Sequence, residues 1–156
     1  MNDPKGPPQV GDLKATCRAI GLSVVEADAN TPNDIPGALA ALANENVNVV
    51  VVLQTNLFLV RCVQIGAIAL EKRLPTVFGY REHVIQGGLV SYGVDLRWCY
   101  RRVGYFVDKI LSGVRCGDPP IEFPTKLWLA ADLNTAKALS VTVPAGLLAR
   151  ADEVIE

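Results

Sequence analysis

The sequence is poor in the residues that build metal and redox sites. It has a single histidine, His83, and four cysteines that lie far apart without any Cys-x-x-Cys spacing. Zinc sites and disulfide frameworks need such residues at regular spacing, so we expect no metal site, no cofactor and no disulfide. His83 is expected on the surface or in a loop, and the thiols are expected to be buried. The cysteines are Cys17, Cys62, Cys99 and Cys116.

A strong charge of either sign is also missing. The chain has 15 basic and 16 acidic residues and a net charge of -1, which gives no electrostatic reason to expect nucleic acid or anionic lipid as a partner. No apolar run reaches the ~18 residues that a membrane span needs. Residues 1–8 (MNDPKGPP) are polar and lack the apolar core of an export signal, so the chain as written is expected in the cytoplasm.

Patterns typical of catalysis are absent as well. The sequence shows no Ser-His-Asp arrangement, phosphate loop, dinucleotide fingerprint or paired carboxylates in a suitable context. Gly87 and Gly88 are better explained by a turn, and the adjacent Glu82 and His83 are weak evidence for acid–base chemistry. We therefore expect that the protein is not an enzyme.

What the chain does have is enough apolar sequence for one compact domain. Half of its 156 residues are hydrophobic and a fifth are charged. Residues 47–53 form an almost unbroken β-branched run, which is typical of a parallel strand covered on both faces. Strand and helix patterns alternate along the chain, which indicates an α/β protein with a doubly wound parallel sheet.

The apolar periodicity predicts the bounds of these elements. Strands are expected over residues 22–27, 47–53, 75–78, 89–92 and 126–131. Helices are expected over residues 10–20, 34–43, 57–72, 81–85, 96–111 and 134–139, with a last short helix within 143–156. Asn33 is the expected N-cap of the second helix, which places Pro36 in the first helical turn.

The helix over residues 96–111 has the clearest amphipathic pattern. Its apolar face consists of Leu96, Cys99, Tyr100, Val103, Phe106, Val107, Ile110 and Leu111. Burial of five of these side chains is worth about 7–15 kcal/mol, at about 1.5–3 kcal/mol each. Left in water, the same face would be an aggregation-prone patch.

Two stretches carry a family resemblance. They are residues 78–95 (FGYREHVIQGGLVSYGVD) and the tail segments 124–126 (PTK), 134–139 (NTAKAL) and 147–155 (LLARADEVI). Together they resemble the ABC transporter substrate-binding proteins of the periplasmic binding protein type I fold, in the branch that includes tryptophan and tyrosine binders. Those proteins are periplasmic, serve an ABC permease and close two α/β lobes over a small ligand.

The resemblance implies that residues 1–156 form a single lobe, the second one, without the first lobe and without this lobe's own first strand. Loss of that strand is expected to leave a gap or an unpaired edge near the centre of the sheet. Residues 95–113 contain the helix that in such proteins packs on the first lobe. We expect it to pack instead in a homo-oligomer through Leu96, Val103, Phe106 and Ile110; the alternative is that it folds back on its own lobe.

Ligand-binding positions are expected beyond the carboxyl ends of the parallel strands. Thr55, Asn56 and Asp95 could instead cap the helices that follow them. Tyr80 offers a face for stacking, and Arg81 could bind a carboxylate or form a solvated pair with Glu82. The complete candidate set is Gln54, Thr55, Asn56, Tyr80, Arg81, Ser91, Tyr92 and Asp95.

Two functions follow from these observations. The first is a solute-binding component of an ABC-type importer, which binds a small molecule such as an aromatic or branched amino acid. The second is a vestigial or structural protein that oligomerises without binding a ligand.

Overall fold

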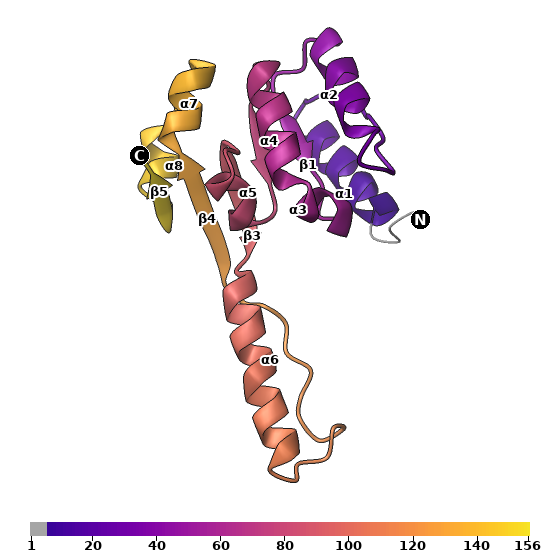
Figure 1. Ribbon diagram of the computed structural model, residues 1–156, viewed down its shortest axis with the longest axis vertical. Coiled ribbons are helices and arrows are strands. Elements are labelled where there is room, and N and C mark those ends of the chain that lie inside the picture. Colours follow the sequence, from indigo (N-terminus) through magenta and orange to yellow (C-terminus); the bar gives the residue numbers. More distant parts are fainter. Residues whose placement is uncertain (1–5) are drawn as a thin grey trace.

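The structure, a computed structural model, describes residues 6–156; residues 1–5 of the polar N-terminal stretch lie outside the described part. The helices are α1 (Gly6–Ala19), α2 (Ile35–Asn44), α3 (Asn56–Val60), α4 (Cys62–Glu71), α5 (Arg81–Ile85), α6 (Leu96–Leu111), α7 (Leu133–Leu139) and α8 (Ala145–Leu148). The strands are β1 (Val50–Val52), β2 (Thr76–Phe78), β3 (Val90–Val94), β4 (Leu127–Asp132) and β5 (Glu153–Ile155). Figure 1 shows a layered α/β body from which α6 projects.

The five strands form one sheet in the order β1-β2-β3-β4-β5. Neighbouring strands are parallel except β3 and β4, which pair antiparallel with Val94 opposite Leu127. The α/β class and a mostly parallel sheet are therefore confirmed. The antiparallel pair arises because β3 leads into α6 and the chain returns from the far end of that helix directly into β4 (Figure 1).

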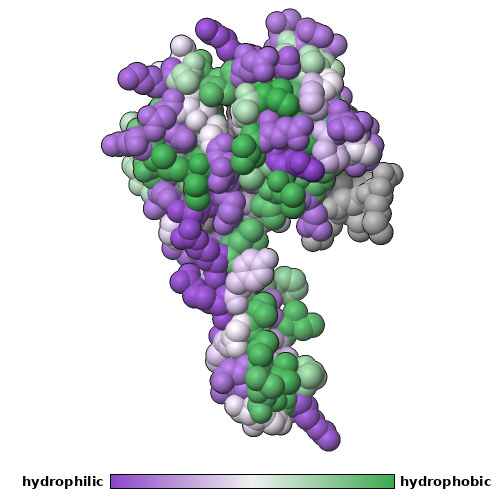
Figure 2. All heavy atoms as spheres, viewed as in Figure 1, coloured by the Kyte–Doolittle hydropathy of each residue, from purple (hydrophilic) through white to green (hydrophobic). Residues whose placement is uncertain are grey.

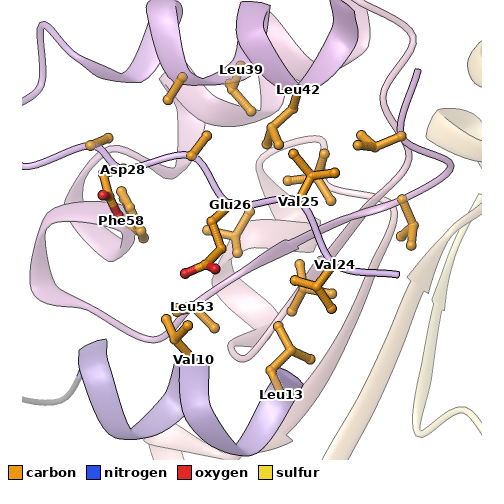
Figure 3. A pocket seen from close by; sticks show the side chains of 18 of the residues that line it. Val10, Leu13, Val24, Val25, Glu26, Asp28, Leu39, Leu42, Leu53 and Phe58 are labelled. Atoms are coloured by element: carbon orange, nitrogen blue, oxygen red, sulfur yellow. The ribbon is translucent and has the colours of Figure 1, made fainter. Parts of the chain in front are cut away.

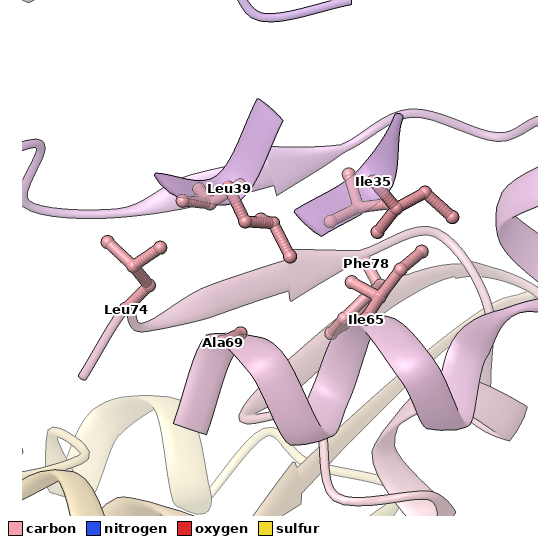
Figure 4. Packing of buried hydrophobic residues seen from close by; sticks show 8 residues of the cluster. Ile35, Leu39, Ile65, Ala69, Leu74 and Phe78 are labelled. Carbon is pink, nitrogen blue, oxygen red and sulfur yellow. The ribbon is translucent and has the colours of Figure 1, made fainter. Parts of the chain in front are cut away.

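The main core lies where α2 and α4 meet β1 and β2. Figure 4 shows Ile35 and Leu39 of α2 approaching Ile65 of α4 and Phe78 of β2. A smaller cluster joins Leu89 to Ala136 and Leu139 of α7. Apolar burial at about 25 cal/mol per Å² makes these two clusters the principal source of the body's stability.

Most expected elements are present, and the differences have local causes. The helix expected over 57–72 is divided at Arg61, whose φ of -103° and ψ of 20° lie in the bridge region and interrupt the helical ladder. The N-cap of α2 is Asp34 rather than Asn33, and the Asp34 carboxylate accepts the N–H groups of Asn30 and Thr31. Pro36 does lie in the first turn of α2.

Two predictions about strands are wrong. Residues 22–27 form no strand, because a cavity separates them from β1 and, within residues 6–156, no other strand lies beside them to accept their hydrogen bonds. Strand β5, by contrast, was not expected. It pairs with β4, and its start is held by the Asp152 N–H bond to Leu129 O, 2.8 Å long.

The predictions for His83 and the thiols also need correction. His83 is 3% exposed, with its ring stacked on Phe78 at a centroid distance of 4.5 Å, so it is a core residue. All four cysteines are free, but Cys116 is exposed and the other three are half-buried rather than buried.

Helix α6 stands apart from the body. None of its residues is buried, and within residues 6–156 no other helix or strand packs extensively against it. Its apolar side chains gather along one side of the projecting arm in Figure 2, with Leu111 82% exposed. The alternative in which α6 folds back onto its own lobe is therefore not what the structure shows.

Candidate ligand-binding face

The loops after β1 and β2 meet the carboxyl end of β3. Gln54 follows β1 and donates a hydrogen bond from Nε2 to the Gly79 carbonyl after β2, at 3.2 Å. Gly93 of β3 approaches the same carbonyl so closely that an added Cβ would lie 2.0 Å from the Gly79 oxygen. This seam of Gln54, Gly79 and Gly93 fixes the spacing of these loops and β3. Gln54 is thus a structural link between loops, which was not foreseen.

Thr55 and Asp95 both cap helices. The Thr55 hydroxyl accepts the Phe58 N–H at 3.2 Å and begins α3. The Asp95 carboxylate accepts the N–H groups of Arg97 and Trp98 at 2.9 and 3.2 Å through Oδ1 and begins α6. Both bonds satisfy N–H groups that otherwise lack a partner at a helix start. Asn56 is the first residue of α3 and its side chain is exposed.

Arg81 forms an ion pair with a residue that was not predicted from the sequence. Its guanidinium binds the Glu153 carboxylate of β5 in forked geometry, with Nη2 2.6 Å from Oε1, rather than pairing with Glu82. The hydrogen bond to Arg81 holds the pKa of Glu153 below its ordinary value, against burial, which raises it. The pair ties α5 to the edge strand. Arg81 therefore serves first as an anchor between these elements.

The aromatic candidates have different surroundings. The Tyr80 ring is half-buried and stacks on His83 with a centroid distance of 6.0 Å. Tyr92, on β3, is 53% exposed and offers the larger free aromatic surface. Ser91 is fully buried in the same strand, and its Oγ has no hydrogen-bond partner within the described residues. Tyr92 therefore has side-chain surface open to a ligand, whereas Ser91 has none.

The buried histidine lies directly behind the face. Its Nε2 lies 3.2 Å from the Phe58 carbonyl, which joins α5 to α3. Burial lowers the pKa of His83, while the hydrogen bonds to Phe58 and Tyr80 oppose that shift. A neutral imidazole in this position supports the Tyr80 ring by stacking. Within residues 6–156 no group of three side chains that could hold a metal ion is found.

Three residues of structural importance were not identified from the sequence. Gln9 of α1 pairs with the Gln54 backbone through its side-chain amide. Glu153 on β5 binds Arg81, and Trp128 on β4 lies opposite Gly93 of β3. A lone glutamine in a helix and a glutamate in a three-residue strand give no local pattern, since their partners are far away in the sequence.

Comparisons with known proteins give a family match and several solved structures with the same fold. The family model for ABC transporter substrate binding protein matches residues 5–155. A conserved domain protein from Vibrio cholerae shares the fold with a TM-score of 0.84 and 24% identity, over 94% of this chain and 49% of that one. A Streptococcus pneumoniae ABC domain solved in complex with L-Trp has a TM-score of 0.83 and 22% identity, over 95% and 51%.

A third structure is the ligand-free, open form of a substrate binding protein with adhesive properties from Clostridium difficile. It has a TM-score of 0.70 and 22% identity, over 100% of this chain and 52% of that one. The chain thus spans about half the length of the solved structures it matches, which fits a single lobe. No curated protein matches it. On the strength of the family match over nearly its whole length, the chain belongs to the ABC transporter substrate binding protein family.

Proposed function

We propose that this chain supplies one wall of a solute-binding cleft that serves an ABC-type importer. The observation that carries the proposal is that the loops after β1 and β2 meet at the carboxyl end of β3, in a chain that belongs to a substrate-binding family. The role is binding rather than catalysis, and the expected partner is an ABC permease.

The proposed ligand is a small molecule, namely an amino acid with an aromatic or branched side chain. Tyr92 supplies an exposed ring for stacking, and the exposed Asn56 amide can donate and accept hydrogen bonds. The Asp95 carboxylate uses Oδ1 for its helix cap, so its second oxygen is the acceptor we assign to a ligand ammonium group. The L-Trp complex of the Streptococcus structure makes tryptophan the first ligand to test.

One lobe gives an open face rather than an enclosed pocket. Small-molecule sites usually bury about 70–90% of the ligand, which needs contacts on both sides. We therefore expect weak binding by a lone subunit and stronger binding when a second wall closes the face. That wall comes, in this proposal, from a homo-oligomer formed through the apolar side of α6, with Leu96, Val103, Phe106 and Ile110 at the contact.

Calorimetry with tryptophan, tyrosine, leucine and isoleucine tests the binding role, with glucose as the unrelated control. Tyr92→Ala should weaken binding of an aromatic ligand about 2- to 10-fold, because one stacking pair is worth about 0.5–1.5 kcal/mol. The matched control Leu70→Ala removes a partly exposed side chain near the end of α4 and should leave affinity unchanged. If none of the four amino acids bound, the proposal would be rejected.

The alternative of a structural protein without a ligand is favoured by one specific observation. Arg81, the most obvious carboxylate binder on the face, already binds Glu153 with two nitrogens. If none of the amino acids binds and the chain oligomerises through α6, this second function replaces the first.

A further inference from the structure

The short helix α3 has no buried residue to anchor it. It comprises the five residues Asn56–Val60, and the interruption at Arg61 separates it from α4. On one side it borders the cavity between β1 and residues 22–30, where the Phe58 ring forms part of the wall (Figure 3). A helix of this length is marginal on its own, so its position depends on individual contacts with neighbouring elements.

His83 makes a polar contact between α5 and α3. Its Nε2 lies 3.2 Å from the Phe58 carbonyl oxygen. Because a carbonyl oxygen only accepts hydrogen bonds, Nε2 carries the proton in this contact and Nδ1 is the unprotonated nitrogen. The imidazole is stacked on Phe78, a buried residue of the main core, so the bond to Phe58 holds α3 to a fixed part of the body.

This contact continues to the proposed binding face through Phe58. The Phe58 carbonyl accepts the hydrogen bond from His83, and the Phe58 N–H donates to the Thr55 hydroxyl at 3.2 Å. Thr55 caps α3, and the next residue, Asn56, has the exposed side chain that we assign to solute contact. His83 is therefore joined to the candidate ligand residues in two steps, and movement of α3 would displace Asn56.

The surroundings of the ring suit a neutral imidazole. His83 is 3% exposed, and its Nδ1 is buried without a hydrogen-bond partner among the described residues. The Tyr80 carbonyl opposes the fall in the pKa of His83, but it already accepts the His83 main-chain N–H at 3.2 Å. Burial is the larger effect and lowers the pKa, so a proton added at Nδ1 would be a buried charge whose N–H lacks a partner.

Charged groups around α5 offset this charge only in part. Glu82, on α5 itself, is the carboxylate that raises the pKa of His83. The Arg81 guanidinium is already bound to Glu153, and the Asp132 carboxylate of β4 caps α7. The other titratable side chains on the elements around α5 are Cys62 and Glu71 of α4, Tyr80 just before α5 and Tyr92 of β3, and α3 and β2 have none.

We propose that His83 is a positioning residue that holds α3 on the proposed binding face while its ring is neutral and releases α3 when Nδ1 takes up a proton. Movement of α3 away from α5 would admit water to the imidazolium. It would leave the buried residues of the main core in place, because α3 contributes none of them. The consequence for solute rests on the proposed function: an amino acid that binds at neutral pH would bind more weakly in acid.

Amide hydrogen exchange tests the release of α3 without any solute. It is measured at about pH 7.5 and 5.5, on either side of the ordinary histidine pKa, and expressed as protection relative to the unfolded chain. The reporters are the Phe58 and Leu59 N–H groups, which both bond to Thr55, and the Asp132 N–H, bonded to the Leu89 carbonyl at 2.9 Å, reports unfolding of the body. At the lower pH the protection of the reporters should fall about three- to tenfold, because the released ring titrates near pH 6.5. At both pH values they should be less protected than Asp132.

Two variants separate the hydrogen bond from the uptake of a proton. His83→Gln keeps an uncharged N–H donor for the Phe58 carbonyl, so the reporters should have the same protection at both pH values. His83→Phe keeps an aromatic ring beside Phe78 but has no donor, so at both pH values the reporters should be less protected than in the parent chain at the higher pH. Circular dichroism verifies that both variants are folded.

The exchange data can overturn the proposal in two ways. Reporters as well protected as Asp132 at both pH values would show that α3 opens only when the whole body unfolds. Protection in the parent chain that is independent of pH, a pH effect that persists in His83→Gln, or full protection in His83→Phe would each show that His83 does not hold the helix.

Calorimetry with tryptophan at the same two pH values tests the consequence for the binding face. The affinity of the parent chain should be about two- to tenfold lower at the lower pH, because the apparent dissociation constant rises as the binding-competent fraction falls. In His83→Gln the ratio of the two affinities should be close to one. Constant affinity in the parent chain, or a fall that persists in the variant, would overturn the link to solute binding. If α3 is released as described and tryptophan binds at neither pH, the amino-acid ligand is rejected and the role of His83 in holding α3 stands.

Discussion

Thr55 and Asp95 each lie where a strand ends and a helix begins. At such positions a side-chain oxygen can cap the helix, and the same position also faces any ligand at the carboxyl edge of the sheet. The structure shows the caps, with both oxygens bonded to backbone N–H groups. Their part in binding stays a prediction, and substitutions at Asp95 can separate the two roles.

Asp95→Ala should lower the free energy of unfolding by about 1 kcal/mol through loss of the α6 cap. Asp95→Asn should keep the stability, because asparagine caps as well as aspartate, and should still weaken amino-acid binding through loss of the charge. Urea denaturation and calorimetry measure the two effects. Unchanged affinity in Asp95→Asn would remove Asp95 from the binding face.

Gly93 allows the close approach of β3 to the loop after β2. Gly93→Ala should destabilise the fold by about 1–3 kcal/mol, because the added methyl would overlap the Gly79 carbonyl and the backbone would have to shift. Gly104→Ala in α6 is the matched control, since nothing lies within 4 Å of its Cβ position. That change should stabilise the helix by up to about 1 kcal/mol. If denaturant titrations gave the same change in the free energy of unfolding for both variants, the close contact between Gly93 and the Gly79 carbonyl would be contradicted.

His83 should make stability depend on pH. The unfolded chain takes up a proton near pH 6.5, while burial lowers the pKa in the fold, so the unfolded state binds more protons below that pH. The free energy of unfolding should therefore fall as pH drops from about 7 toward 5.5, by at most about 1.4 kcal/mol per pH unit. His83→Gln should remove this slope, because the sequence has no other histidine. If the free energy of unfolding still depended on pH in the variant, another titratable group would be its cause.

At the scale of elements, α6 and the chain that returns from it form one arm. Arg102 binds Glu122 of the returning segment in forked geometry, and its guanidinium lies 4.0 Å from the Tyr105 ring centroid. These contacts hold the return segment beside the helix. They leave Val103, Val107 and Ile110 exposed, so within residues 6–156 the apolar side of the arm is uncovered.

Val103→Glu combined with Ile110→Glu should shift the chain toward the monomer if α6 forms the oligomer contact, because two charges would then enter an apolar interface. Arg101→Glu, on the opposite side of the helix, is the control and should leave the assembly state unchanged. Sedimentation of the parent chain and both variants at several concentrations gives the comparison. A parent chain that is monomeric at every concentration would reject the contact.

Elements with a strong local pattern could be predicted from the sequence, and those that depend on a distant partner could not. The run over residues 47–53 and the amphipathic face of 96–111 specify β1 and α6 by themselves. Residues 22–27 are similarly apolar, but a strand also needs a neighbour for its backbone. The Arg81–Glu153 pair joins positions 72 residues apart, a distance over which periodicity carries no information.

At the scale of the whole molecule, the sheet should be least protected from hydrogen exchange next to the cavity between β1 and residues 22–30. The Val51 N–H faces the cavity, whereas the Val50 N–H is bonded to Pro75. Amide hydrogen exchange at Val51 should therefore be faster than at Val50 and faster than at Ser91, which lies in the middle of the sheet between β2 and β4. Uniform protection along β1 and β3 would indicate that the cavity beside β1 is closed in solution.

The attachment of the arm has a mechanical consequence. Only two chain connections, at Val94–Asp95 and at Lys126–Leu127, join it to the sheet, and they lie side by side in the β3–β4 pair. Helix α6 is 16 residues and so about 24 Å long, which means that a rotation of about 10° at this attachment displaces the far end by about 4 Å. The helix is therefore a lever with its pivot next to the loops that we propose bind a solute. Cys116 is exposed and lies in the segment that follows the far end of α6, where an attached fluorophore would report such a rotation.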